Sequence, residues 1–213
     1  MKEKLASEII DTCLKMESLG LNQGTSGNVS VRFNDGMLIT PSGISYDDMR
    51  VDDIVYVDRD GIFEKGKVPS SEYGFHLICY AVRPDINSVV HNHAVNSTAV
   101  AILNRPIPPV HYMIAAAGSD YIPCVPYATF GTDRLSDYVR GGIMESKAIL
   151  LQHHGMIACD ISLKKALWLA VEIETAAKIY LKLLAVTDSP PVLSKDHMRE
   201  VMDKFDSYGL KSI

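Results

Sequence analysis

Histidines with metal-ligand spacing are the strongest chemical signal in this sequence. His91 and His93 stand two residues apart in an apolar segment, and side chains at i and i+2 of a strand emerge on the same face. A second pair, His153 and His154, ends another apolar run just before Gly155, a residue that permits a sharp turn. His91 and His93 alone would also fit surface or hydrogen-bonded core histidines. Three imidazoles that leave one coordination position open are typical of catalytic zinc, so the second pair favours a metal site.

Glu72 is the carboxylate with the most informative position. It follows Ser70 and Ser71 at a predicted helix start, where free backbone N–H groups and the helix dipole stabilise an anion. A glutamate at this place fits an ordinary helix-terminal role as well as a catalytic one. Its position alone does not distinguish the two.

Three short polar loops could cradle an anion. They are the segments 23–28, 40–43 and 70–71, which are rich in glycine, serine and threonine. Each could offer backbone N–H groups and hydroxyls to a phosphate, and each alone would be read as a turn. The GxxxxGK[ST] and GxGxxG patterns are absent from the sequence, so a small phosphorylated metabolite fits better than a nucleotide.

The elements that must position these residues follow from hydrophobic periodicity and turn signals. The order of strands and helices predicts a layered α/β domain with a largely antiparallel sheet, without a strict βαβ alternation. We expect one domain over residues 1–213, with a weaker pattern after Asp188. Helices are predicted at 2–19, 69–82, 96–103, 133–144 and 162–184, and strands at 29–33, 37–40, 54–58, 86–93 and 148–152.

Composition excludes several classes of protein. The chain has 213 residues, 47% of them hydrophobic, and a formal net charge of −5, with no dense basic face of the kind that nucleic acids require. The charged N-terminal segment lacks the apolar core of a signal peptide, and the longest uncharged run, 86–104, is too polar to cross a bilayer. The four cysteines are widely spaced and are expected to be free thiols in the cytoplasm: Cys13, Cys79, Cys124 and Cys159.

Six segments, in their order and spacing, resemble the class II aldolase/adducin superfamily. They are 21–30, 39–43, 69–72, 89–94, 111–115 and 150–155, and the resemblance runs nearly end to end. It implies a three-layer α/β/α fold and a zinc-dependent aldolase, a carbon–carbon lyase. The expected reaction is the reversible cleavage of L-fuculose 1-phosphate, or a closely related ketose 1-phosphate, to dihydroxyacetone phosphate and L-lactaldehyde. The resemblance also implies a homotetramer with active sites between subunits.

The resemblance assigns roles to individual residues. It implies one zinc ion per subunit on His91, His93 and His154, and so selects His154 over His153. Glu72 is implied as a fourth ligand that leaves the metal when substrate arrives and then acts as the acid/base. The implied phosphate contacts are Gly27, Asn28, Ser42, Gly43, Ser70 and Ser71.

Three aromatic residues are also assigned by resemblance. Tyr112 corresponds to a tyrosine that a neighbouring subunit delivers, Phe130 to a residue that lines the pocket, and Tyr208 to a mobile C-terminal tyrosine. From the residues alone, Tyr112 would be read as packing.

Other functions on the same fold remain open. These are a rhamnulose-phosphate aldolase, a dehydratase, or a pentulose-phosphate 4-epimerase, although the epimerases carry aspartate at the position of Glu72. A non-catalytic, adducin-like interaction domain is a further alternative, but such domains lack the histidine set.

Overall fold

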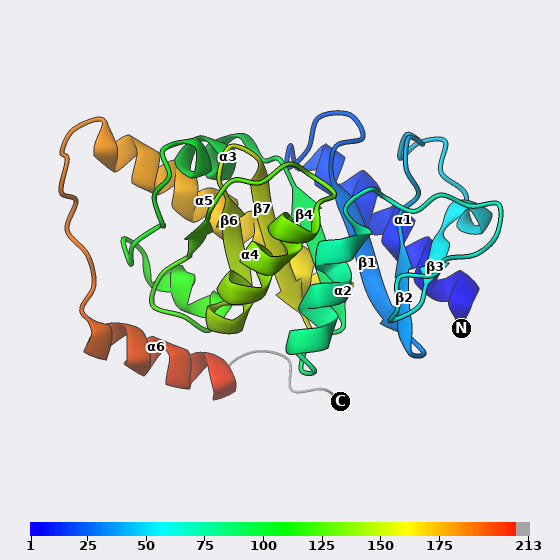
Figure 1. Cartoon of the computed structure of the whole chain (residues 1–213). Coiled ribbons are helices and arrows are strands. Elements are labelled where there is room, and N and C mark those ends of the chain that lie inside the picture. Colours follow the sequence, from blue (N-terminus) through cyan, green and yellow to red (C-terminus); the bar gives the residue numbers. More distant parts are fainter. Residues whose placement is uncertain (208–213) are drawn as a thin grey trace.

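A seven-stranded sheet forms the centre of the computed structural model, which describes residues 1–207 (Figure 1). The strand order is β3-β2-β1-β4-β7-β6-β5, and every neighbouring pair is antiparallel except β5 and β6. The prediction of a largely antiparallel sheet is therefore confirmed. The strands are β1 Asn28–Phe33, β2 Gly36–Ile39, β3 Val55–Val57, β4 Ser88–Asn92, β5 Cys124–Val125, β6 Ala148–Leu151 and β7 Gly155–Asp160.

Helices cover both faces of this sheet, so the predicted three-layer α/β/α architecture is also confirmed (Figure 1). On one face lie α2 (Tyr73–Val82) and α4 (Asp133–Glu145); on the other lie α1 (Lys2–Ser18), α3 (Val95–Ile102) and α5 (Leu163–Leu184). Two short 3-10 helices, η1 (Val51–Asp53) and η2 (Tyr112–Ala117), and the C-terminal α6 (Lys195–Ser207) complete the fold. None of the helices within residues 1–207 is long and apolar enough to cross a membrane.

The alternation of side chains along β4 places His91 on the face of the sheet that α2 and α4 cover. Val89 belongs to the hydrophobic cluster beneath α2 and α4, whereas Val90 belongs to the cluster beneath α1 and α5. Since successive strand residues face opposite sides, His91 lies on the side of Val89. Phe75 of α2 contacts the His91 ring edge-on, with ring centroids 5.3 Å apart.

The structure differs from the sequence prediction at several elements. The prediction missed β7, which follows a turn and ends in Asp160, and it missed α6. It started α2 too early, at residue 69, because Ser70 and Ser71 read as a cap; the helix begins after Glu72. It also extended β4 to His93, which lies just beyond the strand because its N–H bonds to the Asn22 side chain.

Candidate metal centre and phosphate pocket

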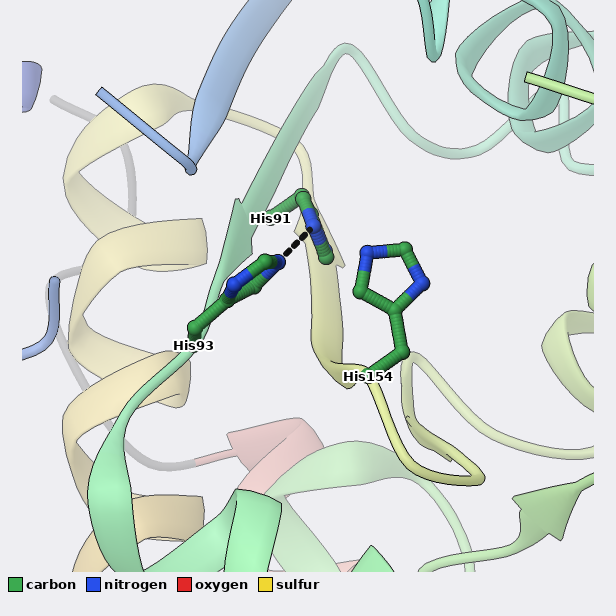
Figure 2. A group of neighbouring side chains, drawn as sticks. All are labelled: His91, His93 and His154. Atoms are coloured by element: carbon green, nitrogen blue, oxygen red, sulfur yellow. Dashed lines mark hydrogen bonds between the residues drawn. The ribbon is translucent and has the colours of Figure 1, made fainter. Parts of the chain in front are cut away.

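His91, His93 and His154 converge on one point, as Figure 2 shows. Their ring centroids lie 4.8 to 4.9 Å apart and the ring planes are tilted by 74 to 79° to one another. Nε2 of His91 and Nε2 of His93 are 3.0 Å apart, and one ligand atom from each of the three residues lies within 4.8 Å of the others. This near-symmetric triangle of imidazole nitrogens could hold a metal ion.

The tautomer of His91 is set by the neighbouring strand. Its Nδ1 lies 2.9 Å from the carbonyl oxygen of Met156 in β7, and a carbonyl can only accept, so Nδ1 carries the proton. Nε2 is then the nitrogen left to bind a metal once it carries no proton, and it faces the other two imidazoles. A backbone acceptor on the second ring nitrogen is the usual way in which proteins orient a metal-binding histidine.

The turn 152–154 brings His154 to the site, and Gly155 allows that turn to pack closely. A Cβ at Gly155 would lie 2.4 Å from the carbonyl oxygen of Asn92 and 2.8 Å from Cδ2 of His93. The prediction of a sharp turn at Gly155 is wrong, because the left-handed residue is His153, with φ of 55°. Gly155 is needed because β7 begins directly against the end of β4.

Glu72 lies against two of the three histidines, His91 and His154, and is almost completely buried. Its Oε2 is 3.2 Å from Nε2 of His91, and its Oε1 is 3.1 Å from Nε2 of His154. Burial opposes the charged carboxylate, but the imidazoles of His91 and His154 outweigh it and lower the pKa of Glu72 well below its ordinary value. Glu72 is therefore held here as an anion.

The donor set fits a divalent metal. Oε1 of Glu72 is buried, and within the described residues it accepts no hydrogen bond of good geometry, although Nε2 of His154 lies 3.1 Å away. Such an atom costs free energy unless something satisfies it. Three imidazole nitrogens and this carboxylate oxygen together match the N and O ligands and the ligand number that zinc prefers. Burial and the neighbouring His91 also lower the pKa of His93 to about 3, which keeps that imidazole neutral and able to bind a metal.

A cavity of about 450 Å³ opens beside the histidines, within the size range of small-molecule sites. Glu72, His93 and His154 lie in its wall together with Phe130 and Tyr127. The wall also contains all of the residues implied as phosphate contacts, namely Gly27, Asn28, Ser42, Gly43, Ser70 and Ser71. The three polar loops that the sequence singled out thus meet in one cavity, and their contact with phosphate stays a prediction.

Backbone pairing brings two of these loops together. The N–H of Ser70 donates to the carbonyl of Thr40, and the N–H of Ser42 donates to the carbonyl of Val68, each at 3.0 Å. The Ser70 hydroxyl accepts the N–H of Glu72 at 3.3 Å. The loop after β2 and the loop before α2 are therefore one paired unit, and Glu72 is attached to it.

Asn22 ties the remaining loop to the metal centre, and sequence reasoning did not identify it. Its Oδ1 accepts the N–H of His93 at 3.1 Å, and its Nδ2 donates to the hydroxyl of Tyr46 at 2.7 Å. Tyr46 in turn donates to the carbonyl of Gly27 at 2.7 Å. A Cβ at Gly27 would lie 2.1 Å from Nδ2 of Asn22, so only glycine allows this contact. The pattern offered no signal for Asn22, because a loop asparagine ordinarily reads as a turn residue.

The predictions for the three aromatic residues differ in how the structure bears on them. Phe130 lines the cavity and is exposed. Tyr112 begins η2 with 49% of its surface exposed, and it is not among the residues of the described chain that line the cavity. Tyr208 lies outside the described residues.

Comparison with known proteins identifies the family. Residues 7–181 match the family described as "Class II Aldolase and Adducin N-terminal domain". The chain belongs to this class II aldolase and adducin family. As an aldolase of this class it is an aldehyde-lyase, and its three converging histidines are able to bind a metal.

Several relatives of this aldolase match over almost their whole length. An "L-fuculose phosphate aldolase" from Escherichia coli (strain K12) is 60% identical over 210 residues, which are 99% of this chain and 98% of the relative. A "5-methylthioribulose-1-phosphate/5-deoxyribulose-1-phosphate aldolase" from Escherichia coli O45:K1 (strain S88 / ExPEC) is 57% identical over 209 residues, 98% of each chain. A solved structure described as "L-fuculose 1-phosphate aldolase" has a TM-score of 0.90 at 36% identity and covers 95% of this chain and 96% of its own.

Proposed function

We propose that this protein is a zinc-dependent aldolase that reversibly cleaves L-fuculose 1-phosphate to dihydroxyacetone phosphate and L-lactaldehyde. The observation that carries the proposal is the group of three converging imidazoles, two of which contact the anionic Glu72, at the wall of a cavity that glycine and serine loops surround. The 60% identity to an L-fuculose phosphate aldolase supports the choice of substrate.

The site supplies electrophilic and acid/base chemistry in one place. Zinc on His91, His93 and His154, when bound, provides a Lewis acid that stabilises negative charge developing on substrate oxygens. Glu72 would be the fourth ligand of that metal in the absence of substrate and would be released from it when substrate binds. The burial of Glu72 places its charge in surroundings of low dielectric constant, which strengthens its electrostatic contacts in the site.

Two protons must move when the bond between C3 and C4 breaks. The C4 hydroxyl loses a proton through the Tyr112 phenol of a neighbouring subunit as C4 becomes the aldehyde. The electron pair of the broken bond stays at C3, beside the C2 carbonyl. Glu72, which is anionic before the reaction, takes up a proton equivalent to the one released from the C4 hydroxyl and delivers it to C3. One proton leaves an oxygen and one is added to carbon, so the reaction balances, and synthesis uses the same groups in the opposite direction.

The serine and glycine loops bind the phosphate group. The hydroxyls of Ser42, Ser70 and Ser71, with Gly27, Gly43 and the start of α2, offer donors and a positive helix end to an anion. These contacts fix the distance between the phosphate and the reacting carbons, which contributes orientation rather than chemistry. Asn28 and Phe130 complete the wall.

A second substrate class has a specific observation in its favour. The relative at 57% identity is described as an aldolase for 5-methylthioribulose 1-phosphate and 5-deoxyribulose 1-phosphate, which share the ketose 1-phosphate end with L-fuculose 1-phosphate. Tyr127 and Phe130 add aromatic surface to the same cavity, and such surface suits an apolar aldehyde tail. This class is the alternative substrate.

The assembly completes the site in this proposal. We propose a cytoplasmic homotetramer of a single class II aldolase domain over residues 1–213. Tyr112 is half-exposed and does not line the cavity of its own chain, which supports an active site that takes this tyrosine from a neighbour. We also propose a catalytic role for the C-terminal Tyr208, as the resemblance implies.

The test is a product assay on purified, zinc-loaded protein. We expect dihydroxyacetone phosphate from L-fuculose 1-phosphate, with a higher kcat/KM than for 5-deoxyribulose 1-phosphate, 5-methylthioribulose 1-phosphate or rhamnulose 1-phosphate. A chelator should remove about one zinc per chain and the activity together. A higher kcat/KM for a 5-substituted ribulose phosphate would favour the alternative substrate, and inversion at C4 without cleavage would refute the aldolase assignment.

A further inference from the structure

A row of buried polar side chains runs from Glu72 away from the metal centre. Nδ2 of Asn28 donates to Oε2 of Glu72 at 2.8 Å, and Oδ1 of Asn28 lies 2.6 Å from Nε2 of His76. On the other side of the His76 ring, Nδ1 lies 2.7 Å from the hydroxyl of Ser30, which is 2.8 Å from the hydroxyl of Tyr80. All five residues are buried, and His76 and Ser30 are completely so.

Only one set of proton positions satisfies this row when Glu72 is ionised. A carboxylate can only accept, so the Asn28 amide must turn its nitrogen to Glu72 and its oxygen to His76. His76 must then carry its proton on Nε2, which leaves Nδ1 to accept the Ser30 proton. Ser30 accepts from Tyr80 in turn. The donors therefore all point in one direction, from Tyr80 towards Glu72.

We propose that His76 is a positioning residue for catalysis: as the Nε2–H tautomer it fixes the orientation of the Asn28 amide, and through it the Glu72 carboxylate. The proposal rests on the acid/base role of Glu72 proposed above. The opposite His76 tautomer would turn the Asn28 oxygen towards Oε2 of Glu72, so that two acceptors would face each other. This row of hydrogen-bonded side chains, from Tyr80 through Ser30, His76 and Asn28 to Glu72, is called the relay below. It selects one position and one hydrogen-bond partner for the Glu72 carboxylate.

The surroundings favour this role over simple packing. His76 stacks on Phe75, with ring centroids 4.9 Å apart, in a place where an apolar side chain would avoid the cost of burying two polar nitrogens. Burial lowers the pKa of His76 to about 3, which keeps the ring neutral and so keeps one nitrogen as donor and the other as acceptor. Arg32 lies over the Tyr80 ring, 4.9 Å from its centroid, and holds the far end of the row.

A matched pair of variants tests the proposal. The amide nitrogen of His76→Gln can take the place of Nε2 and donate to Asn28, whereas the shorter His76→Asn reaches only the place of Nδ1. We expect kcat for His76→Asn to fall by about 10²-fold, the effect of a misplaced catalytic group. KM should change much less than kcat, because Asn28 is the only implied phosphate contact whose amide is reoriented and the serine and glycine loops are unchanged. For His76→Gln we expect kcat within about tenfold of the unmodified enzyme. Equal kcat values for the two variants would overturn the proposal.

The tautomer of His76 provides a readout that does not depend on turnover. Imidazole ¹⁵N NMR of the substrate-free, zinc-loaded protein should show His76 protonated on Nε2 with an unprotonated Nδ1, and Ser30→Ala should shift that population. A ring protonated on Nδ1 would refute the relay, even if neither His76 variant folds. Full activity of a Glu72 variant would instead refute the proposed function, so the two failures are distinguishable.

Discussion

Glu72 contacts the imidazoles of His91 and His154 and accepts a hydrogen bond from the Asn28 amide. It caps the start of α2 without a side-chain hydrogen bond to that helix, so its carboxylate is directed into the site rather than used for the helix end. A glutamate with an ordinary helix-terminal role would be largely exposed. The structure therefore favours the catalytic reading of this residue over the electrostatic one.

Replacement of Glu72 by glutamine should separate chemistry from binding. Because Glu72→Gln keeps the shape but cannot transfer a proton, we expect kcat to fall by about 10²- to 10⁴-fold, with KM little changed and zinc retained by the three histidines. Steady-state kinetics with metal analysis measures both. The exposed Glu17→Gln on α1 is the control, and normal turnover of zinc-loaded Glu72→Gln would remove Glu72 from the acid/base role.

At the scale of elements, α5 holds the segment that follows the metal-binding strand. Oε1 of Glu174 accepts the backbone N–H of Asn96 at 2.9 Å and its side-chain Nδ2 at 2.6 Å, while Oε2 accepts the N–H of Ser97 at 2.8 Å. These are orphan N–H groups of the first turn of α3, which starts two residues after His93. A carboxylate from another helix thus replaces a local cap.

Loss of this carboxylate should destabilise the protein. Glu174→Ala leaves the N–H groups of α3 without their acceptor, and we expect the free energy of unfolding to fall by about 1–3 kcal/mol. Urea denaturation followed by the fluorescence of Trp168, on the same helix, measures the change. Glu172→Ala is the control: it removes another glutamate side chain from α5 and should lower the free energy of unfolding much less. Equal losses for the two variants would show that helix propensity, not capping, causes the effect.

At the scale of the whole molecule, the buried relay makes stability depend on pH. The folded pKa of His76 is lowered by burial to about 3, against an ordinary value of 6.5. Between these values the unfolded chain binds a proton at this residue and the native state does not. This residue therefore lowers the free energy of unfolding as pH falls from about 6.5 towards 3, by up to about 1.4 kcal/mol per pH unit.

Comparison of variants isolates the contribution of His76 from that of other groups. In urea titrations at several pH values, His76→Gln should show a smaller loss of stability between pH 6.5 and 3 than the unmodified protein. His197→Gln, which changes an exposed histidine, should keep the original slope. An unchanged slope in His76→Gln would mean that His76 is protonated in the native state at these pH values.

Local sequence pattern determined the position of several helices and strands of this protein, and its family. The periodicity of 162–184 predicted α5 almost to its ends, and the turn signals predicted the strands before Glu72. Motif order predicted the family, and thereby the aldolase class, because the site residues sit in short segments of fixed spacing. Helical and strand periodicity depend on which side of an element is buried, and that information is local in sequence.

Only the tertiary structure decided which side chains meet. His154 reaches His91 because β7 pairs with β4, so that His91 faces Ile157 and Asn92 faces Met156 in register, and Gly155 lets the turn approach. The Glu72 relay joins β1 to α2, and Asn22 joins three loops, through contacts between residues 24 to 71 positions apart. Such contacts depend on how the layers pack, which no local pattern records. The sequence determined the ligand types and the fold class, and packing determined the geometry that can hold a metal.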